Sequence, residues 1–407
     1  MTVSPLAPDS FPPVPRIAGV TLATAASEMK YRGRDDMLLM RLADGATTAG
    51  VFTRSDTAAA PVTWCRERLR SAGTARAILV NAGNANAFTG AAGMAAVRAC
   101  CAGIASRLGY QADDMLMAST GVIGEPLDTG VLEARFDDLA TGEADWQDAA
   151  RAIMTTDTFA KGASATTQIG GIPVTISGIA KGSGMIAPDM ATMLGFIATD
   201  AALPADTLAI LLRRATATSF NAITVDSDSS TNDSVFLIAS GAASHGTVDG
   251  ADDPALDGFR TALDTVMQDL AQQIVRDGEG ASKFVTVTVS GAADNAAAHR
   301  IGMAIANSPL VKTAIAGEDA NWGRIVMAVG KAGEGIDQTR ISVSIGGMLI
   351  AADGGRVDGY DEAPVAAHMA GDSIAIEVTV GGGAGTSRIW TCDLTHGYIS
   401  INADYRS

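Results

Sequence analysis

The residues with the clearest chemical potential lie in one segment, which reads KGSGMIAPDMATMLGF over residues 181–196. An alternating apolar run at 172–180 leads into Lys181, and a second apolar run begins just after Ala191 and Thr192. Glycines between the two runs permit backbone torsions that other residues avoid, so the loop can aim the Thr192 hydroxyl out of a sheet. That hydroxyl is a candidate nucleophile, and a surface threonine in a Gly/Pro turn is the plainer alternative.

A threonine hydroxyl needs a base to become a good nucleophile, and an N-terminal threonine carries one in its own α-amine. The ordinary pKa of an α-amine is about 7.7–8.0, and a neighbouring cation such as Lys181 would lower it further. This chemistry requires the chain to be cut immediately before Thr192. The segment alone leaves both interpretations open.

Patterns on either side of this segment predict the elements that must position it. Short β-branched or alternating apolar runs predict strands, and apolar residues at helical spacing predict helices. The expected strands are 76–83, 172–180, 194–199, 284–291, 340–350 and 373–380. The expected helices are 93–110, 131–140, 144–154, 205–220 and 257–277. This mixture predicts an α/β (α+β mixed) layered fold, and no linker-like run separates independent domains.

Composition narrows the classes of function. The 407 residues include 29 Lys+Arg and 45 Asp+Glu, a net charge of −16, which disfavours nucleic acid and anionic membranes as partners. No uninterrupted apolar run of about 18 residues predicts a transmembrane helix, and the N-terminus lacks the pattern of a secretory signal. The four cysteines and four histidines have neither disulfide-framework nor metal-ligand spacing. We therefore expect a cytoplasmic protein with no metal and no other cofactor.

The segment KGSGMIAPDMATMLGF resembles the self-cleavage signature of the ornithine acetyltransferase family, the glutamate N-acetyltransferases of arginine biosynthesis. Other segments resemble the same family in the same order, over nearly the whole chain. They are VNAGNANAFTG (80–90), ASTGVIGEPL (118–127), MTTDTFAK (154–161), DSDSSTNDS (226–234), RDGEGASKF (276–284), ANWGRI (320–325) and DLTHGYISINADYRS (393–407). Ser227 is a departure, because the family more often has glycine there.

The resemblance implies a layered α/β sandwich like that of the self-processing aminopeptidases. It also implies self-cleavage between Ala191 and Thr192. The products would be an α chain, 1–191, and a β chain, 192–407, of 407 − 191 = 216 residues. The two chains would stay together, and two such pairs would form an α2β2 heterotetramer.

The same resemblance implies the reaction. Thr192 would take the acetyl group of N2-acetyl-L-ornithine and pass it to L-glutamate in a ping-pong sequence, through an acetyl-Thr192 intermediate. The tetrahedral oxyanion of each half-reaction needs fixed donors, and Thr120 and Gly121 match the family's oxyanion-hole pair. Some members also acetylate glutamate from acetyl-CoA, and the sequence leaves open whether this chain does so.

Six positions carry over as substrate-binding residues. They are Thr155, Lys181, Thr192, Glu279, Asn402 and Ser407. A lysine suits the carboxylate of an acetylated amino acid, and the Glu279 carboxylate suits an amine. Thr155 is preferred to Thr156 only by its ungapped spacing to Lys181, and Ser407 is the last residue of the sequence.

Two other classes of function remain as alternatives. A self-processing aminopeptidase with an N-terminal threonine would share the fold and hydrolyse peptides. A non-catalytic α/β binding protein would require a decayed site, which Thr192, Lys181, Thr120 and Glu279 argue against.

Overall fold

The computed structural model describes residues 2–187 and 193–403. They divide into two compact units. The large unit contains Asp9–Asn221 and Asp228–Ile274, and the rest of the described chain forms the small unit. Within the described part, no helix is both long and apolar enough to cross a membrane.

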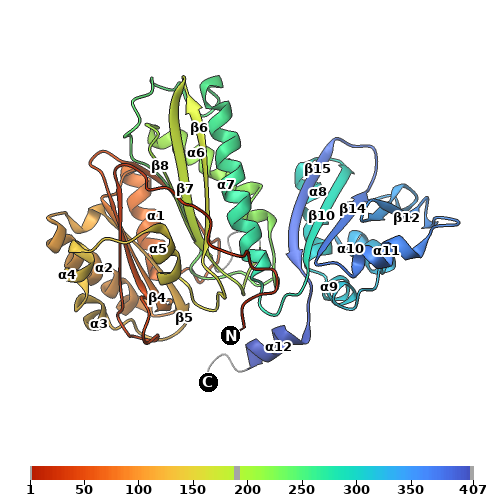
Figure 1. Cartoon of the computed structure of the whole chain (residues 1–407), viewed down its shortest axis with the longest axis horizontal. Helices are drawn as coiled ribbons and strands as arrows, with labels where there is room; N and C mark the ends of the chain where they lie inside the picture. The colour runs from red at the N-terminus through yellow and green to blue at the C-terminus, as the bar shows by residue number, and fades with distance from the viewer. Residues whose placement is uncertain (1, 188–192, 404–407) are drawn as a thin grey trace. The chain divides into compact units, whose positions relative to one another are not determined.

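The large unit contains a four-stranded sheet in the order β1-β2-β4-β5 (Figure 1). Its strands are β1 (Val20–Ala25), β2 (Met37–Leu42), β4 (Ala77–Asn84) and β5 (Met115–Val122). β4 and β5 are parallel, whereas the other neighbours are antiparallel. Helix α1 (Ala60–Ala72) and helix α2 (Gly90–Leu108) contact β5, and the short helices α3 (Thr129–Glu133), α4 (Phe136–Thr141) and α5 (Trp146–Ala152) follow it.

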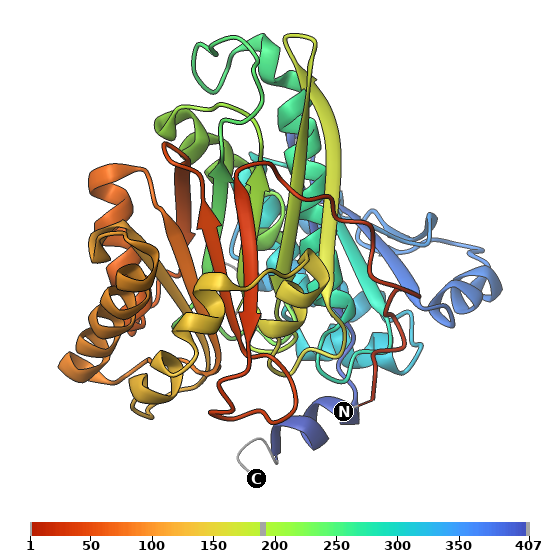
Figure 2. The same ribbon diagram turned by 60° about the vertical axis from the view of Figure 1, so that its left-hand side comes forward.

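A five-stranded sheet in the order β3-β9-β8-β7-β6 forms the second layer of this unit. Its strands are β3 (Thr47–Phe52), β9 (Ser234–Ala239), β8 (Leu194–Thr199), β7 (Ile172–Lys181) and β6 (Lys161–Ile169). Helices α6 (Ala205–Ala217) and α7 (Asp257–Arg276) lie against this sheet (Figures 1 and 2). One hydrophobic cluster includes Leu38 and Ile78 of the first sheet and Phe196 and Phe236 of the second. The predicted layered α/β sandwich is therefore confirmed.

The small unit is built on a six-stranded sheet in the order β13-β12-β11-β14-β10-β15. Its strands are β10 (Phe284–Ala292), β11 (Ser342–Ile345), β12 (Met348–Ala352), β13 (Gly355–Arg356), β14 (Ser373–Thr379) and β15 (Gly385–Cys392). Its helices are α8 (Asn295–Ala306), α9 (Pro309–Ala316), α10 (Trp322–Lys331), α11 (Glu362–Met369) and α12 (His396–Ala403). Helix α8 packs on β10 and β15, which gives this unit a helix-on-sheet core of its own.

Most predicted elements are present, and two of them are divided. The predicted helix 131–140 is two helices, because Arg135 leaves helical torsions (φ −111°, ψ 0°) and begins α4 as its N-cap. The predicted strand 340–350 is a hairpin of β11 and β12. Gly346 and Gly347 form its turn with φ of +58° and +78°.

Candidate active site

Thr192, Ala191 and Ser407 lie outside the described residues, so the site is built from the chain around them. β7 ends at Lys181, and Met193 leads directly into β8. These two strands are antiparallel neighbours, and Lys181 is paired with Leu194. The segment that carries Thr192 therefore starts and ends at the same end of the five-stranded sheet.

Lys181 forms the centre of a cluster of predicted site residues. Its ammonium group is 2.7 Å from the hydroxyl oxygen of Thr155 and 3.4 Å from that of Thr120, and the residue is 2% exposed. The neighbouring Thr156 hydroxyl lies instead 2.7 Å from the hydroxyl of Ser183. The structure thus brings together Thr120, Thr155 and Lys181, with Thr155 rather than Thr156 in contact with the lysine.

Gly121 follows Thr120 in β5, where the backbone of β4 runs very close. Its φ is +133°, and a Cβ atom there would lie 2.2 Å from the carbonyl carbon of Gly83. Both the torsion and the close approach require glycine. The backbone around the predicted oxyanion-hole pair is consequently fixed by the pairing of two buried strands.

Asp157 is a site residue that the sequence analysis missed. One of its carboxylate oxygens accepts hydrogen bonds from the Lys161 ammonium (2.7 Å) and the Gly182 amide (2.6 Å). The other accepts from the Thr155 amide (3.0 Å) and lies 3.9 Å from the Lys181 ammonium. Burial alone would raise the pKa of Asp157, but the two lysine charges outweigh it and hold this pKa well below its usual range.

Asp233 is a second buried carboxyl beside the segment of interest. Its Oδ1 accepts a hydrogen bond from the amide of Met193 at 2.9 Å, and the residue is fully buried. Its Oδ2 is also buried, and no hydrogen-bond partner for it exists among the described residues. Burial raises the pKa of this carboxyl well above its ordinary value, because the Met193 amide and the charge of Lys181 compensate only part of the lost hydration.

The side chain of Asn232 forms hydrogen bonds with the backbone near the ends of both β4 and β5. Its side-chain amide donates to the carbonyl oxygen of Ala85 (2.6 Å) and to that of Ser119 (2.8 Å). Ser119 in turn donates its hydroxyl to Asn81 of β4 at 2.6 Å. This buried network supports the strand position directly before Thr120.

In the small unit, Glu279 and Asn402 are in contact, since the Asn402 side-chain amide donates to the Glu279 carboxylate at 2.8 Å. Helix α12 carries Asn402 and packs closely against the turn that contains Glu279. The Thr395 hydroxyl donates to the carbonyl of Gly280 at 2.6 Å, and a Cβ atom on Gly280 would lie 2.3 Å from the amide nitrogen of Tyr398. Glycine at 280 is therefore a condition for this placement of α12.

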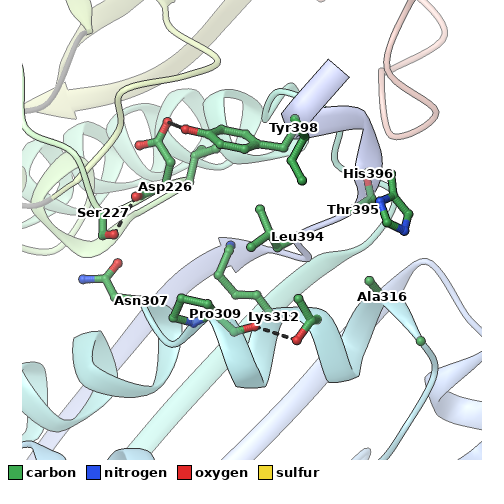
Figure 3. Close-up of a pocket in the computed structure, with 14 residues that line it drawn as sticks. Asp226, Ser227, Asn307, Pro309, Lys312, Ala316, Leu394, Thr395, His396 and Tyr398 are labelled. Carbon is green, nitrogen blue, oxygen red and sulfur yellow. Dashed lines mark hydrogen bonds between the residues drawn. The ribbon is translucent and has the colours of Figure 1, made fainter. Parts of the chain in front are cut away.

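A pocket of about 660 Å³ lies beside α12 within the small unit (Figure 3). On one side the Tyr398 hydroxyl donates to the Asp226 carboxylate at 3.3 Å, and on the other side α9 presents Pro309 and Lys312 (Figure 3). Ser227 also lines the pocket and has a φ of +64°, which explains why a family relative would favour glycine there.

The arrangement in the large unit places the predicted oxyanion-hole pair beside a buried cation. Thr120 contributes a hydroxyl and Gly121 the next backbone N–H, and the Lys181 ammonium group lies beside that hydroxyl. The residues that sequence reasoning missed, Asp157, Asn232 and Asp233, fall within MTTDTFAK and DSDSSTNDS. Both segments carried the family resemblance, which was the available signal.

Comparisons with known proteins agree along the whole chain. Residues 21–407 match the ArgJ family. The arginine biosynthesis bifunctional protein ArgJ of Gluconobacter oxydans is 55% identical over 409 residues, covering 100% of this chain and 96% of that protein. The protein of the same name from Agrobacterium fabrum is 52% identical over 412 residues, covering 100% of both.

A crystal structure of the arginine biosynthesis bifunctional protein ArgJ from Bacillus halodurans is also similar. It shares 42% sequence identity with a TM-score of 0.51, and the match covers 53% of this chain and 100% of that chain. With a match from residue 21 to residue 407 and full-length relatives above 50% identity, the chain belongs to the ArgJ family.

Proposed function

We propose that the chain transfers the acetyl group of N2-acetyl-L-ornithine to L-glutamate through an acetyl group carried on Thr192. As a member of the ArgJ family, it is a bifunctional acyltransferase of arginine biosynthesis, with glutamate N-acetyltransferase and amino-acid N-acetyltransferase activities. The second activity uses acetyl-CoA as the acetyl donor, as a substrate rather than a resident cofactor. The observation that carries the proposal is the Lys181–Thr155–Thr120 cluster at the sheet end from which the Thr192 segment departs.

In the proposed turnover, the free α-amine of Thr192 takes the proton of its own hydroxyl as the oxygen attacks the acetyl carbonyl. The Thr120 hydroxyl and the Gly121 N–H donate to the resulting oxyanion. Ornithine leaves with a proton from the α-ammonium group, and the amine of glutamate then attacks the acetyl-enzyme. This order of events gives ping-pong kinetics.

The free amine arises in the proposal by self-cleavage between Ala191 and Thr192. The five-stranded sheet supports the persistence of a two-chain product, because β8 and β9 would belong to 192–407, and β3, β7 and β6 to 1–191. Hydrogen bonds between β7 and β8 and between β3 and β9 would then join the two chains. The length of the B. halodurans chain also supports cleavage. That chain matches 53% of this one, and the proposed β chain, 192–407, is a similar share, 216 of 407 residues.

Charge supports a carboxylate ligand near Lys181. The Lys181 ammonium group is buried and lies 2.7 Å from the Thr155 hydroxyl, and an ammonium group beside a hydroxyl suits a carboxylate ligand. We therefore assign the substrate carboxylate to Lys181, with Thr155 beside it. Glu279, Asn402 and Ser407 remain our proposed contacts to the rest of the substrate, and the Glu279 carboxylate suits an amine.

We also propose assembly and location. Two cleaved pairs would form an α2β2 heterotetramer of about 82.6 kDa (2 × 41.3 kDa), which light scattering can measure. The four cysteines are buried and unpaired, which fits a reducing compartment such as the cytoplasm.

The decisive experiment compares Thr192→Ala with Thr192→Ser in transfer assays with N-acetylornithine and glutamate. We expect Thr192→Ala to remain one chain without transfer, and Thr192→Ser to cleave and retain activity because its hydroxyl is kept. Normal transfer by Thr192→Ala would refute the proposal, and peptide hydrolysis without transfer would favour the aminopeptidase alternative.

A matched pair of variants tests the substrate site. Thr155→Ala removes the hydroxyl that contacts Lys181, whereas Thr156→Ala removes the neighbouring hydroxyl that contacts Ser183. A rise in KM for N-acetylornithine is expected to be larger for Thr155→Ala. Equal effects of the two substitutions would remove the reason for choosing Thr155.

A further inference from the structure

We propose that Asp233 donates the proton that the nitrogen of Thr192 needs when the chain cleaves itself, a role that rests on the self-cleavage proposed above. The backbone of Met193 anchors the carboxyl for this task. Its amide donates to Asp233 Oδ1 at 2.9 Å, and its carbonyl accepts from the amide of Ser234 at 3.2 Å. Residues 233 and 234 thus hold both backbone groups of the residue that directly follows Thr192.

Covalent connectivity places the carboxyl one residue from the scissile bond. Asp233 Oδ1 accepts a hydrogen bond from the amide of Met193, and Met193 is bonded directly to Thr192. Among residues 193–403, Asp233 is the one residue whose side-chain carboxyl accepts a hydrogen bond from the Met193 amide.

The second oxygen has the character of a proton donor. Asp233 Oδ2 is buried and has no hydrogen-bond partner in the described part of the chain, and no ion pair to Asp233 occurs there. A buried carboxyl without a partner cation is stable in its protonated form, and its raised pKa agrees with this. The Oδ2 hydroxyl is consequently available to an acceptor that the described residues do not supply.

Self-cleavage requires such a donor. The Thr192 hydroxyl oxygen bonds to the carbonyl carbon of Ala191, and the bond from that carbon to the Thr192 nitrogen breaks. An amide nitrogen leaves as an amine only if it gains a proton, which Asp233 Oδ2 gives, and the carboxylate then takes the proton lost by the threonine hydroxyl. Water finally hydrolyses the ester, leaving the Ala191 carboxylate and restoring the hydroxyl, so Asp233 ends as it began.

A proton donor and a mere support for β8 can be separated by substitution. Asp233→Asn keeps an oxygen for the Met193 amide and has nearly the same shape, but it cannot transfer a proton. Asp233→Ala removes both functions and leaves space for formic acid, which can act as the missing donor. Asp264→Asn is a matched control, because burial also raises the pKa of Asp264, which lies on α7.

The experiment measures the cleavage rate of the full chain by intact mass, with the fold monitored by circular dichroism. We expect Asp233→Asn to be folded and to cleave about 10²–10⁴-fold more slowly than the parent, the usual contribution of a general acid. Formate should accelerate Asp233→Ala in proportion to its concentration, and Asp264→Asn should cleave at the parental rate.

Cleavage of Asp233→Asn within about twofold of the parental rate would overturn the inference. Thr192→Ala separates this failure from failure of the proposed function. If Thr192→Ala stays intact while Asp233→Asn cleaves normally, only the role of Asp233 is wrong. If Thr192→Ala itself cleaves at this bond, the proposed function is wrong.

Discussion

Asp157→Asn is the substitution with the largest effect on stability that the site predicts. The Asp157 carboxylate and the Lys161 ammonium are both fully buried and 2.7 Å apart. Removal of the negative charge leaves the lysine in a low-dielectric interior, where it also contacts the carbonyl oxygen and the aromatic ring of Phe159. Loss of one partner of a buried pair costs about 3–5 kcal/mol, so the free energy of unfolding of the large unit should fall by that amount.

The assay is denaturant unfolding followed by the fluorescence of Trp64 and Trp146, which are both buried in the large unit. Asp252→Asn is a control for burial, because its ion pair with Arg214 has a similar length of 2.6 Å but is exposed. It should leave the unfolding midpoint unchanged.

A double variant tests the physical cause. Lys161→Met added to Asp157→Asn removes the stranded charge and replaces it with an apolar side chain of similar length. Such a replacement often restores the stability that the single substitution removes. An Asp157→Asn protein within about 1 kcal/mol of the parent, or a double variant less stable than the single one, would refute the reasoning about buried charge.

Three further predictions concern activity and pH. Gly121→Ala should lower kcat about 10²–10³-fold, because it displaces an oxyanion donor. Gly124→Ala is the control, since Gly124 also has a positive φ (+85°) but has open space around it, and its kcat should not fall. Equal losses of kcat in the two variants would argue against the donor role of Gly121. Glu279→Gln should raise KM for the amine substrate about 10–100-fold through loss of a charged hydrogen bond. The glutamine can still accept the hydrogen bond from Asn402, so the local structure is kept. An unchanged KM would exclude a contact between Glu279 and the substrate amine. Because the pKa of Asp157 is lowered by folding, its stabilisation is complete above the ordinary pKa of about 3.9 and is lost as the pH falls. Between pH 5 and 2, the free energy of unfolding should therefore fall more steeply for the parent than for Asp157→Asn, by up to about 1.4 kcal/mol per pH unit. Parallel plots of the free energy of unfolding against pH for the two proteins would contradict the lowered pKa of Asp157.

The sequence predicted most elements of the fold because their apolar patterns are long and regular. The strand at 172–180 and the helix at 257–277 are each found within one residue of their expected bounds. The strand predicted at 340–350 was wrong for a local reason, since a Gly-Gly pair inside an apolar run can be a kink or a tight turn. In the structure, Gly346 and Gly347 form the turn.

For the site, a family pattern predicts residues that are alike from protein to protein, but it does not say which residues touch. The contact of Lys181 with Thr155 rather than Thr156 depends on the path of the chain after α5. Asp157 could not be predicted as a partner of Lys161 and Lys181, because the neutralisation of buried charge is a property of tertiary packing. Asp233 is similar, since only the parallel pairing of β8 and β9 brings it to Met193.

The central claim is that a free α-amine on Thr192 serves the reaction, and the intact mass of the active protein tests it most directly. The account predicts two chains, one ending at Ala191 and one beginning at Thr192, whose masses sum to that of the 41.3 kDa chain plus one water. N-terminal sequencing of the larger chain should begin Thr-Met-Leu-Gly. A fully active preparation that contains only the uncut chain would contradict the account.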